Sequence, residues 1–231
     1  MNLFSDIHAH FIYGVDDGAQ TREEMEAMLD AAWRDGVTEL IATPHMTPGV
    51  YEFPEERFLR HLKEAREYCL ARGYHLQLYP GAEILYTPAL EPYLAEHSLP
   101  TLANSSYVLL EFTPSIPYAE IVSAVELMDR NGLVPVLAHV ERYQAFSSGS
   151  RIYQLKEQCR VLYQMNGRTV IHGKGFFKNL RIQRWLRDHL IDYIATDSHN
   201  CTSRSTCMQE AYSVLNRQYG TEYANHLTGI L

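Results

Sequence analysis

Short runs that combine histidine with aspartate or glutamate recur along this chain, and these residue types can bind metal ions. The first is Asp6-Ile7-His8-Ala9-His10. Side chains alternate between the faces of an extended strand, so His8 and His10 point the same way and can reach one ion. Asp6 shares that face and is expected to orient a histidine. Similar groups end later apolar runs: Thr43-Pro44-His45, Gly81-Ala82-Glu83, Leu110-Glu111-Phe112, Ala138-His139-Val140-Glu141-Arg142 and Thr196-Asp197-Ser198-His199.

The size of this set makes metal binding the favoured interpretation. A single His-x-His pair is a weak signal, because a buried strand can hold two hydrogen-bonded histidines without a metal. A core seldom places so many ionisable groups at strand ends, since burying each costs several kcal/mol unless it is paired or ligated. Nitrogen and oxygen ligands without a thiolate suit Mn²⁺, Fe²⁺ or Zn²⁺. A cluster of such ions lowers the pKa of bridging water enough to supply hydroxide near neutral pH.

Strand-like and helix-like stretches alternate along the chain, which predicts an α/β fold with a parallel sheet or barrel. Thr21 and Glu24 form a capping box that begins one helix, which should end near Asp35. Further helices are expected near residues 54–72, 118–130, 151–158, 178–189 and 205–218. Strands are expected near residues 3–8, 37–42, 75–79, 107–112, 133–138, 161–165 and 191–196. Seven strands nearly suffice to close a barrel, and we expect residues 1–231 to form one domain.

A barrel would bring the metal-binding motifs together. The loops after the carboxyl ends of its strands form one open face, where the chemistry of such folds gathers. Each motif follows the last apolar positions of a predicted strand: His8 and His10, His45, Glu83, Glu111, His139, and Asp197 with His199. The sequence therefore predicts that residues far apart along the chain share one rim.

Charge and hydropathy exclude some functions. The formal net charge is −8, so the chain lacks the basic surface that holds a phosphate backbone, and no nucleic-acid partner is expected. The N-terminal segment lacks the basic and apolar stretches of a secretory signal, and no later window approaches a membrane span. We therefore expect a cytoplasmic protein without membrane insertion.

Other polar residues have simpler interpretations. Four histidines without an acidic partner at comparable spacing are expected at the surface: His61, His97, His189 and His226. Asp16 and Asp17 precede a glycine, which favours a turn, although their closeness to His10 also allows metal binding. Arg142 and Arg204 each follow a motif histidine and could bind an anion through a bidentate fork or lie solvated at the surface.

In their order along the chain, these motifs resemble those of the bacterial tyrosine-protein phosphatases of capsular and exopolysaccharide synthesis. That family belongs to the polymerase-and-histidinol-phosphatase (PHP) superfamily. The resemblance covers almost the entire chain, including connecting segments such as Gly49-Val50-Tyr51-Glu52. It implies a distorted (β/α)₇ barrel, similar to a TIM barrel, that carries three divalent ions, commonly manganese, on the strand-end rim.

The resemblance also implies roles for individual residues. One metal would have four ligands: His8, His10, Glu83 and Asp197. A second metal would share Glu83 and add two more: Glu111 and His139. The third would have three: Asp17, His45 and His199. Arg142 and Arg204 would bind the phosphate.

The implied activity is hydrolysis of phosphotyrosine on a bacterial tyrosine kinase, at its tyrosine-rich C-terminal tail, by metal-activated hydroxide. A tyrosyl leaving group has a conjugate-acid pKa of about 10, so it departs more easily than a serine alkoxide. A cysteine-based mechanism would need an arginine six residues after the cysteine. None of the four cysteines has one, and all are expected to be free thiols: Cys69, Cys159, Cys201 and Cys207.

Three other functions share parts of this pattern. A small-molecule phosphatase acting on histidinol phosphate would have the same metal site and different rim loops. An amidohydrolase or deaminase barrel also begins with His-x-His, but a central lysine or another histidine order would be expected, and Glu83 and Glu111 fit it poorly. An inactive phosphotyrosine-binding module would have lost ligands, whereas all nine positions are filled.

Overall fold

Strands and helices alternate along the chain in the computed structural model, which describes residues 3–173 and 175–229. The strands are Phe4–Ala9 (β1), Val37–Ala42 (β2), His45–Met46 (β3), Gln77–Pro80 (β4), Glu83–Leu85 (β5), Tyr107–Glu111 (β6), Val134–Leu137 (β7), Leu162–Asn166 (β8) and Tyr193–Ala195 (β9). The α-helices are Arg22–Arg34 (α1), Glu55–Ala71 (α2), Leu90–Glu96 (α3), Tyr118–Arg130 (α4), Arg151–Gln158 (α5), Gly167–His172 (α6), Phe176–Arg187 (α7), Met208–Tyr219 (α8) and Thr221–Leu227 (α9). Short 3₁₀ helices cover Leu102–Asn104 (η1), Val140–Arg142 (η2) and Gln144–Phe146 (η3).

Two strands of the barrel are kinked. The pair β2–β4 continues directly into the pair β3–β5, and both pairs are parallel. Pro44 interrupts the first strand because it has no N–H to donate to the ladder. Gly81 interrupts the second, where a Cβ atom would lie 2.9 Å from Ile41 Cγ2. With β2–β3 and β4–β5 each counted as one kinked strand, the described residues form the seven strands that the sequence predicts.

The strands follow one another around a barrel in chain order. β1 pairs with β2, and the pairing continues from β5 through β6, β7 and β8 to β9. At the rim, Asp197 N–H donates to His8 O (2.9 Å) and His10 N–H donates to Ser198 O (2.8 Å), which joins the segment after β9 to β1. At the opposite end, η1 packs between β4 and β6. The barrel is therefore distorted. Backbone hydrogen bonds join its first and last strands at the end that carries the metal-binding motifs.

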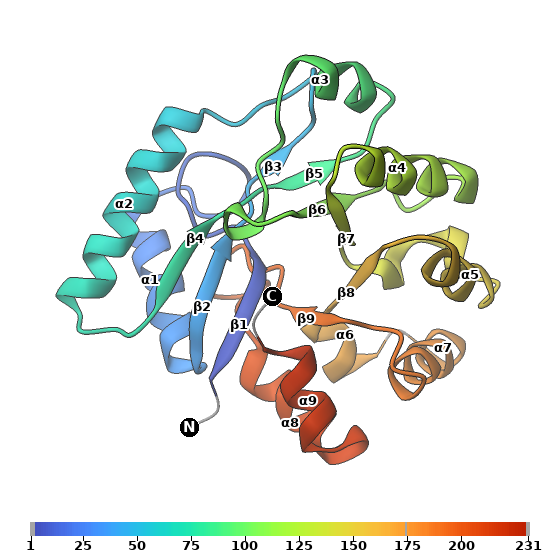
Figure 1. Cartoon of the computed structure of the whole chain (residues 1–231). Helices are drawn as coiled ribbons and strands as arrows, with labels where there is room; N and C mark the ends of the chain where they lie inside the picture. Colours follow the sequence, from blue (N-terminus) through green and yellow to red (C-terminus); the bar gives the residue numbers. More distant parts are fainter. Residues whose placement is uncertain (1–2, 174, 230–231) are drawn as a thin grey trace.

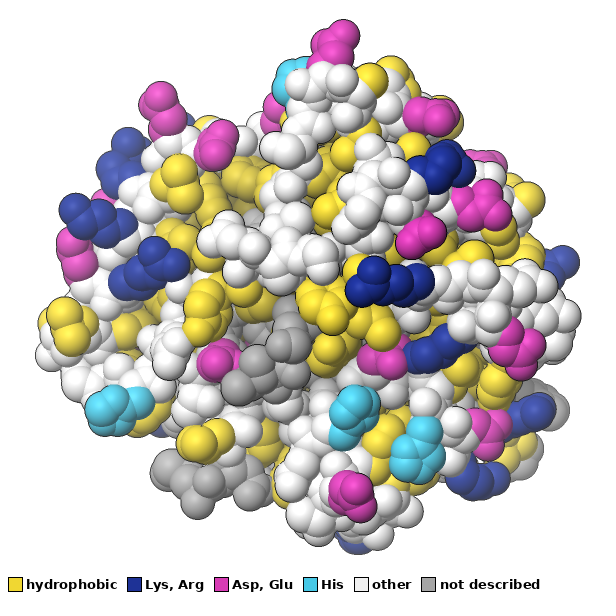
Figure 2. Space-filling model, in the orientation of Figure 1, with side chains coloured by type: hydrophobic (Ala, Val, Ile, Leu, Met, Phe, Trp, Pro, Cys, Tyr) yellow, Lys and Arg dark blue, Asp and Glu magenta, His cyan; other side chains and the backbone are white. Residues whose placement is uncertain are grey.

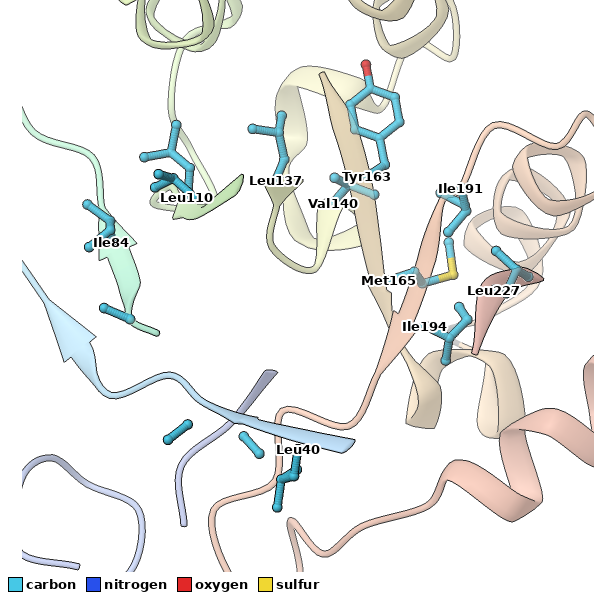
Figure 3. Close-up of a cluster of buried hydrophobic side chains, with 14 of the residues drawn as sticks. Leu40, Ile84, Leu110, Leu137, Val140, Tyr163, Met165, Ile191, Ile194 and Leu227 are labelled. Carbon is cyan, nitrogen blue, oxygen red and sulfur yellow. The ribbon is translucent and has the colours of Figure 1, made fainter. Parts of the chain in front are cut away.

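The helices surround the strands, as Figure 1 shows: α1 and α2 lie beside β2 and β4, α4 lies beside β6 and β7, and α8 and α9 lie below β1 and β9. A large apolar layer separates helices from strands, and Figure 3 shows part of it, with Leu110, Leu137 and Met165 from neighbouring strands. A smaller cluster fills the barrel itself and includes Ile7, Ile41, Leu102, Leu109, Val136, Ala138 and Ala195.

Alternation along each strand separates these two layers. On β6, Val108 and Leu110 join the outer layer, whereas Tyr107 and Leu109 join the inner one. Glu111 is the next inward position, at the carboxyl end of the strand. The inward-facing column is thus apolar at one end of the barrel and ionisable at the other.

The predicted helices and strands are confirmed to within a few residues, and α3, α6 and α9 were not predicted. Thr21 caps α1 as expected, because its Oγ1 accepts from Glu24 N–H (3.2 Å) and Glu24 Oε2 accepts from Thr21 N–H (3.3 Å). The surface prediction for His97, His189 and His226 is confirmed.

The surface prediction for His61 is wrong. Its side chain is 6% exposed, its Nδ1 lies 2.9 Å from Tyr13 O, and its ring stacks on the Tyr13 ring with 3.6 Å between centroids. The absence of an acidic partner did not indicate exposure, because a backbone carbonyl and an aromatic ring satisfy this imidazole.

The surface carries charges of both signs. On the face drawn in Figure 2, acidic and basic side chains are interspersed among apolar ones.

The cysteines are free thiols, as predicted. No helix among the described residues combines the length and the apolar character that crossing a bilayer requires.

Candidate metal centre

The nine predicted ligands lie together at the carboxyl ends of the strands. They come from six of the strands or from the loops that follow them: His8 (β1), His10 and Asp17 (after β1), His45 (β3), Glu83 (β5), Glu111 (β6), His139 (after β7), and Asp197 and His199 (after β9). The parallel barrel therefore produces the shared rim that the sequence predicts.

Glu83 occupies the middle of this cluster. Its Oε2 lies 3.1 Å from His8 Nε2, 3.3 Å from His10 Nε2 and 3.1 Å from His45 Nδ1, while its Oε1 lies 3.0 Å from His139 Nε2. Burial opposes ionisation, but His8 and the hydrogen bonds from His10, His139 and His45 hold the pKa of Glu83 well below its usual value. A buried carboxylate surrounded by four imidazoles is a suitable centre for a cation cluster.

Three groups of ligand atoms are compact enough to share an ion, with all atoms of a group within 4.8 Å of one another. The groups are His10, Asp17, His45 and His199; then His8, His10 and Asp197; then His45, Glu83 and Glu111. The first contains the ligands that the family resemblance implies for the third metal, together with His10. The second contains the ligands implied for the first metal, except Glu83. The last contains His45 in place of His139, although His139 Nε2 lies 3.2 Å from Glu111 Oε1.

The cluster stabilises positive charge, as a site that binds metal ions should. Burial disfavours the charged imidazole, but hydrogen bonds to Asp16 and Glu83 raise the pKa of His10 to about 10. Against the same opposing burial, Glu111 and Glu83 raise the pKa of His139 to about 9. An environment that holds extra protons this strongly also suits divalent cations, which compete for the same lone pairs.

His199 presents a free lone pair to the cluster. Burial and the neighbouring His10 lower its pKa to about 4, so the ring is neutral at physiological pH. Its Nδ1 lies 3.0 Å from Asp197 O and can donate to that carbonyl. Its buried Nε2 has no hydrogen-bond partner among the described residues and lies 3.3 Å from Asp17 Oδ1. An orphaned buried nitrogen beside a carboxylate is the arrangement that a metal ion would complete.

Two arginines border the cluster and meet at one carboxylate. Arg142 Nη2 lies 2.6 Å from Asp197 Oδ2, and Arg204 Nη2 lies 2.8 Å from Asp197 Oδ1. Their side chains are 33% and 39% exposed, so neither is a fully solvated surface arginine. Burial opposes ionisation of Asp197, but the neighbouring imidazoles and Arg142 lower its pKa. Each guanidinium has further N–H donors, which suit a phosphate group.

Two further acidic residues, Asp16 and Asp6, lie near His8 and His10. Asp16 forms the expected turn, accepting from Gly18 N–H (2.9 Å), and it also contacts His10 Nδ1 at 2.6 Å. Asp6 was expected to orient a histidine, and it contacts the backbone of His8 instead of its ring. It accepts from Thr196 N–H (3.0 Å) and His8 N–H (3.3 Å), so it joins β1 to the backbone directly after β9, and burial raises its pKa to about 6.

Three buried polar residues beside the cluster were not predicted. Gln164 and Asn166 occupy alternate positions of β8, and Glu141 accepts from Thr169 Oγ1 at 2.8 Å. The alternation in Leu162-Tyr163-Gln164-Met165-Asn166 is the signal that could have identified the first two, because it places both amides on the inward face.

The fold and the rim define the class: a parallel α/β barrel with a histidine and carboxylate cluster at its strand ends. Residues 4–229 match the family described as capsular polysaccharide synthesis, CpsB/CapC, and the chain belongs to this family.

Named relatives extend this assignment. The chain is 34% identical over 228 residues to "Tyrosine-protein phosphatase CpsB" of Streptococcus pneumoniae, covering 96% of this chain and 93% of the relative. Among solved structures, it resembles one described as YwqE from Bacillus subtilis and CpsB from Streptococcus pneumoniae, unique metal-dependent tyrosine phosphatases. The TM-score is 0.85 at 28% identity, over 96% of this chain and 90% of the other. A histidinol phosphate phosphatase from Lactococcus lactis shares the fold, with a TM-score of 0.60 at 13% identity over 96% and 94%.

Proposed function

We propose that this chain is a metal-dependent protein-tyrosine phosphatase. The observation that carries the proposal is the position of Glu83, a buried carboxylate within 3.3 Å of nitrogen atoms from four histidines. Family membership and the names of the relatives support it. Residues 4–229, the matched range, span almost the whole chain, so we propose that residues 1–231 are one phosphatase domain.

The cluster would hold three divalent ions, with Mn²⁺ as the first candidate and Fe²⁺ or Zn²⁺ as the others. Nine side chains would be the ligands: His8, His10, Asp17, His45, Glu83, Glu111, His139, Asp197 and His199. Bound ions would supply Lewis acidity, because they lower the pKa of nearby water and polarise phosphoryl oxygens.

Arg142 and Arg204 would bind the phosphoryl group and stabilise the charge that develops on its oxygens. The two guanidinium groups donate to different oxygens of Asp197, so this one carboxylate positions both arginines. A tyrosyl leaving group, with a pKa of about 10, needs little help from a general acid. The weak need for a general acid agrees with a rim whose charged groups are proposed to bind cations and phosphate.

The proposed substrate is a phosphotyrosine-bearing bacterial tyrosine kinase that controls polysaccharide synthesis, at its C-terminal tyrosine cluster. The family description, which concerns capsular polysaccharide synthesis, supports this choice. Such a substrate places the reaction in the cytoplasm. A histidinol phosphate phosphatase remains the competing function, because that enzyme shares the fold.

The test compares kcat/KM for a phosphotyrosine peptide and for histidinol phosphate, each with and without a chelator. We expect preference for the peptide and loss of activity with the chelator. Preference for histidinol phosphate would overturn the substrate assignment, and cleavage that persists in the chelator would overturn metal dependence.

A further inference from the structure

β8 provides no ligand to the proposed metal cluster, yet it carries two buried polar side chains. Gln164 is fully buried and Asn166 is 8% exposed. Alternation turns both toward the cluster, while Tyr163 and Met165, labelled in Figure 3, belong to the outer apolar layer. Burying two amides at inward positions would cost free energy unless they were hydrogen-bonded, so their partners show which groups they hold in place.

Gln164 connects His8 on β1 with His139 in the turn after β7. Its Oε1 accepts from the backbone N–H of His139 at 2.7 Å and lies 3.2 Å from His8 Nδ1. A backbone N–H can only donate, so the atom facing it must be the amide oxygen, which fixes the orientation of the side chain. That oxygen then requires a proton on His8 Nδ1. The other nitrogen, Nε2, faces Glu83 Oε2 at 3.1 Å.

The hydrogen bonds continue in one direction to Asp197. Gln164 Nε2 donates to Asn166 Oδ1 at 2.9 Å, and Asn166 Nδ2 donates to Asp197 Oδ2 at 2.9 Å. Because the orientation of Gln164 is fixed, that of Asn166 is fixed as well. The two amides thus connect the His8 side chain of β1, the backbone of the turn after β7 and the Asp197 side chain of the turn after β9.

The backbone at the two flanking turns gives independent support. His139 has φ 34° and Asp197 has φ 53°, in the left-handed region that residues with a Cβ atom rarely adopt. His139 donates a backbone hydrogen bond to Gln164, and Asp197 accepts one from Asn166. Disfavoured conformations persist when the surroundings hold them, and they concentrate at functional sites.

We propose that Gln164 and Asn166 are positioning residues for the metal cluster. Gln164 selects the His8 tautomer that carries its proton on Nδ1, which leaves Nε2 available as a ligand. Through Asn166 the same unit holds Asp197. The inference rests on the proposed function, because it takes His8 and Asp197 as metal ligands.

The test uses calorimetry with Mn²⁺ alone and ¹⁵N-histidine NMR of the Zn²⁺-loaded protein. Gln164→Leu keeps the approximate size and removes the acceptor, and it should lower Mn²⁺ affinity about 10- to 100-fold and weaken the Nδ1–H signal of His8. Gln164→Glu keeps the acceptor for His8 and loses the donor to Asn166, so it should restore the His8 Nδ1–H signal and only part of the Mn²⁺ affinity. Tyr163→Phe is the matched control, because it removes a buried hydrogen bond to Ile152 O on the outward face of the same strand. It should lower the melting temperature and leave Mn²⁺ affinity unchanged.

Should Gln164→Leu not fold, Asn166→Ala serves in its place, with weaker Mn²⁺ binding and an intact His8 Nδ1–H signal. Wild-type affinity in Gln164→Leu or Asn166→Ala would overturn the positioning role. So would equal losses in Gln164→Glu and Gln164→Leu, or a comparable loss in Tyr163→Phe. These results presuppose a wild-type protein that binds Mn²⁺. A wild-type protein that binds none of Mn²⁺, Fe²⁺ and Zn²⁺ would overturn the proposed function itself, and the positioning role with it.

Discussion

The two ends of the barrel are built from the same strands and have opposite chemistry. On β6, the inward positions Tyr107 and Leu109 are apolar, and the next inward position is Glu111. On β9, Tyr193 and Ala195 are followed in the same way by Asp197. A single period-two pattern therefore provides a packed interior at one end and a ligand cluster at the other.

This difference separates stability from activity. Side chains at the apolar end stabilise the fold by burial, whereas those at the rim repel one another unless protons or cations lie between them. Substitutions at the rim should therefore act mainly on metal binding and turnover. Substitutions at the apolar end should act mainly on the free energy of unfolding.

Glu83→Gln should have the largest effect, because it removes the central negative charge and nearly preserves shape. We expect kcat for a phosphotyrosine peptide to fall by about 10³-fold, with weaker Mn²⁺ binding and an unchanged circular dichroism spectrum. Steady-state kinetics and calorimetry measure these quantities. Turnover within tenfold of the wild type would show that Glu83 is not central.

Arg204→Ala should have the next largest effect. The side chain is proposed to contact the phosphoryl group, so kcat/KM should fall about 10²-fold while bound Mn²⁺ stays at the wild-type amount. Arg204→Lys, which keeps the charge and loses the planar fork, should recover only part of the activity. Loss of metal together with activity would instead assign Arg204 to holding Asp197.

Leu109→Ala tests the apolar end. Leu109 is fully buried inside the barrel, so truncation should lower the free energy of unfolding by about 2–5 kcal/mol. Mn²⁺ affinity and kcat, measured well below the melting temperature, should stay unchanged. A large change in metal affinity would mean that the two ends of the barrel are coupled.

The smallest effect is expected for the buried cysteines. Burial raises the pKa of the Cys69 thiol to about 11 and that of Cys207 to about 12. Both should resist alkylation at pH 8, and become reactive only as pH approaches these values, whereas the exposed Cys201 should react. Mass spectrometry after iodoacetamide treatment gives the sites. Cys69→Ala should keep wild-type kcat, and its inactivity would favour thiol chemistry over metal chemistry.

The sequence was sufficient to predict the seven strands and most residues of the rim, because both depend on local alternation and strand order. Asp17, which lies in a turn, was identified as a ligand only through the family resemblance. It did not predict that β2–β3 and β4–β5 would be kinked. Those kinks depend on a close approach between chain segments, such as Gly81 against Ile41, which has no local signature. The buried position of His61 depends in the same way on its stacking with Tyr13 from another segment.

Residues that hold the ligands were harder to predict than the ligands themselves. Histidine and carboxylate attract notice by type, whereas Gln164 and Asn166 are ordinary residues whose importance depends on burial and on partners from other strands. Asp6 shows the converse, since its position beside His8 suggested contact with a ring and its carboxylate instead joins two backbones.

The most direct test of the rim as a metal-dependent active site is stepwise restoration of metal-stripped protein with Mn²⁺. We predict that stripped protein does not hydrolyse a phosphotyrosine peptide, and that phosphate release returns in proportion to Mn²⁺ bound, with no recovery in Glu83→Gln. Undiminished phosphate release by the stripped protein would contradict the account.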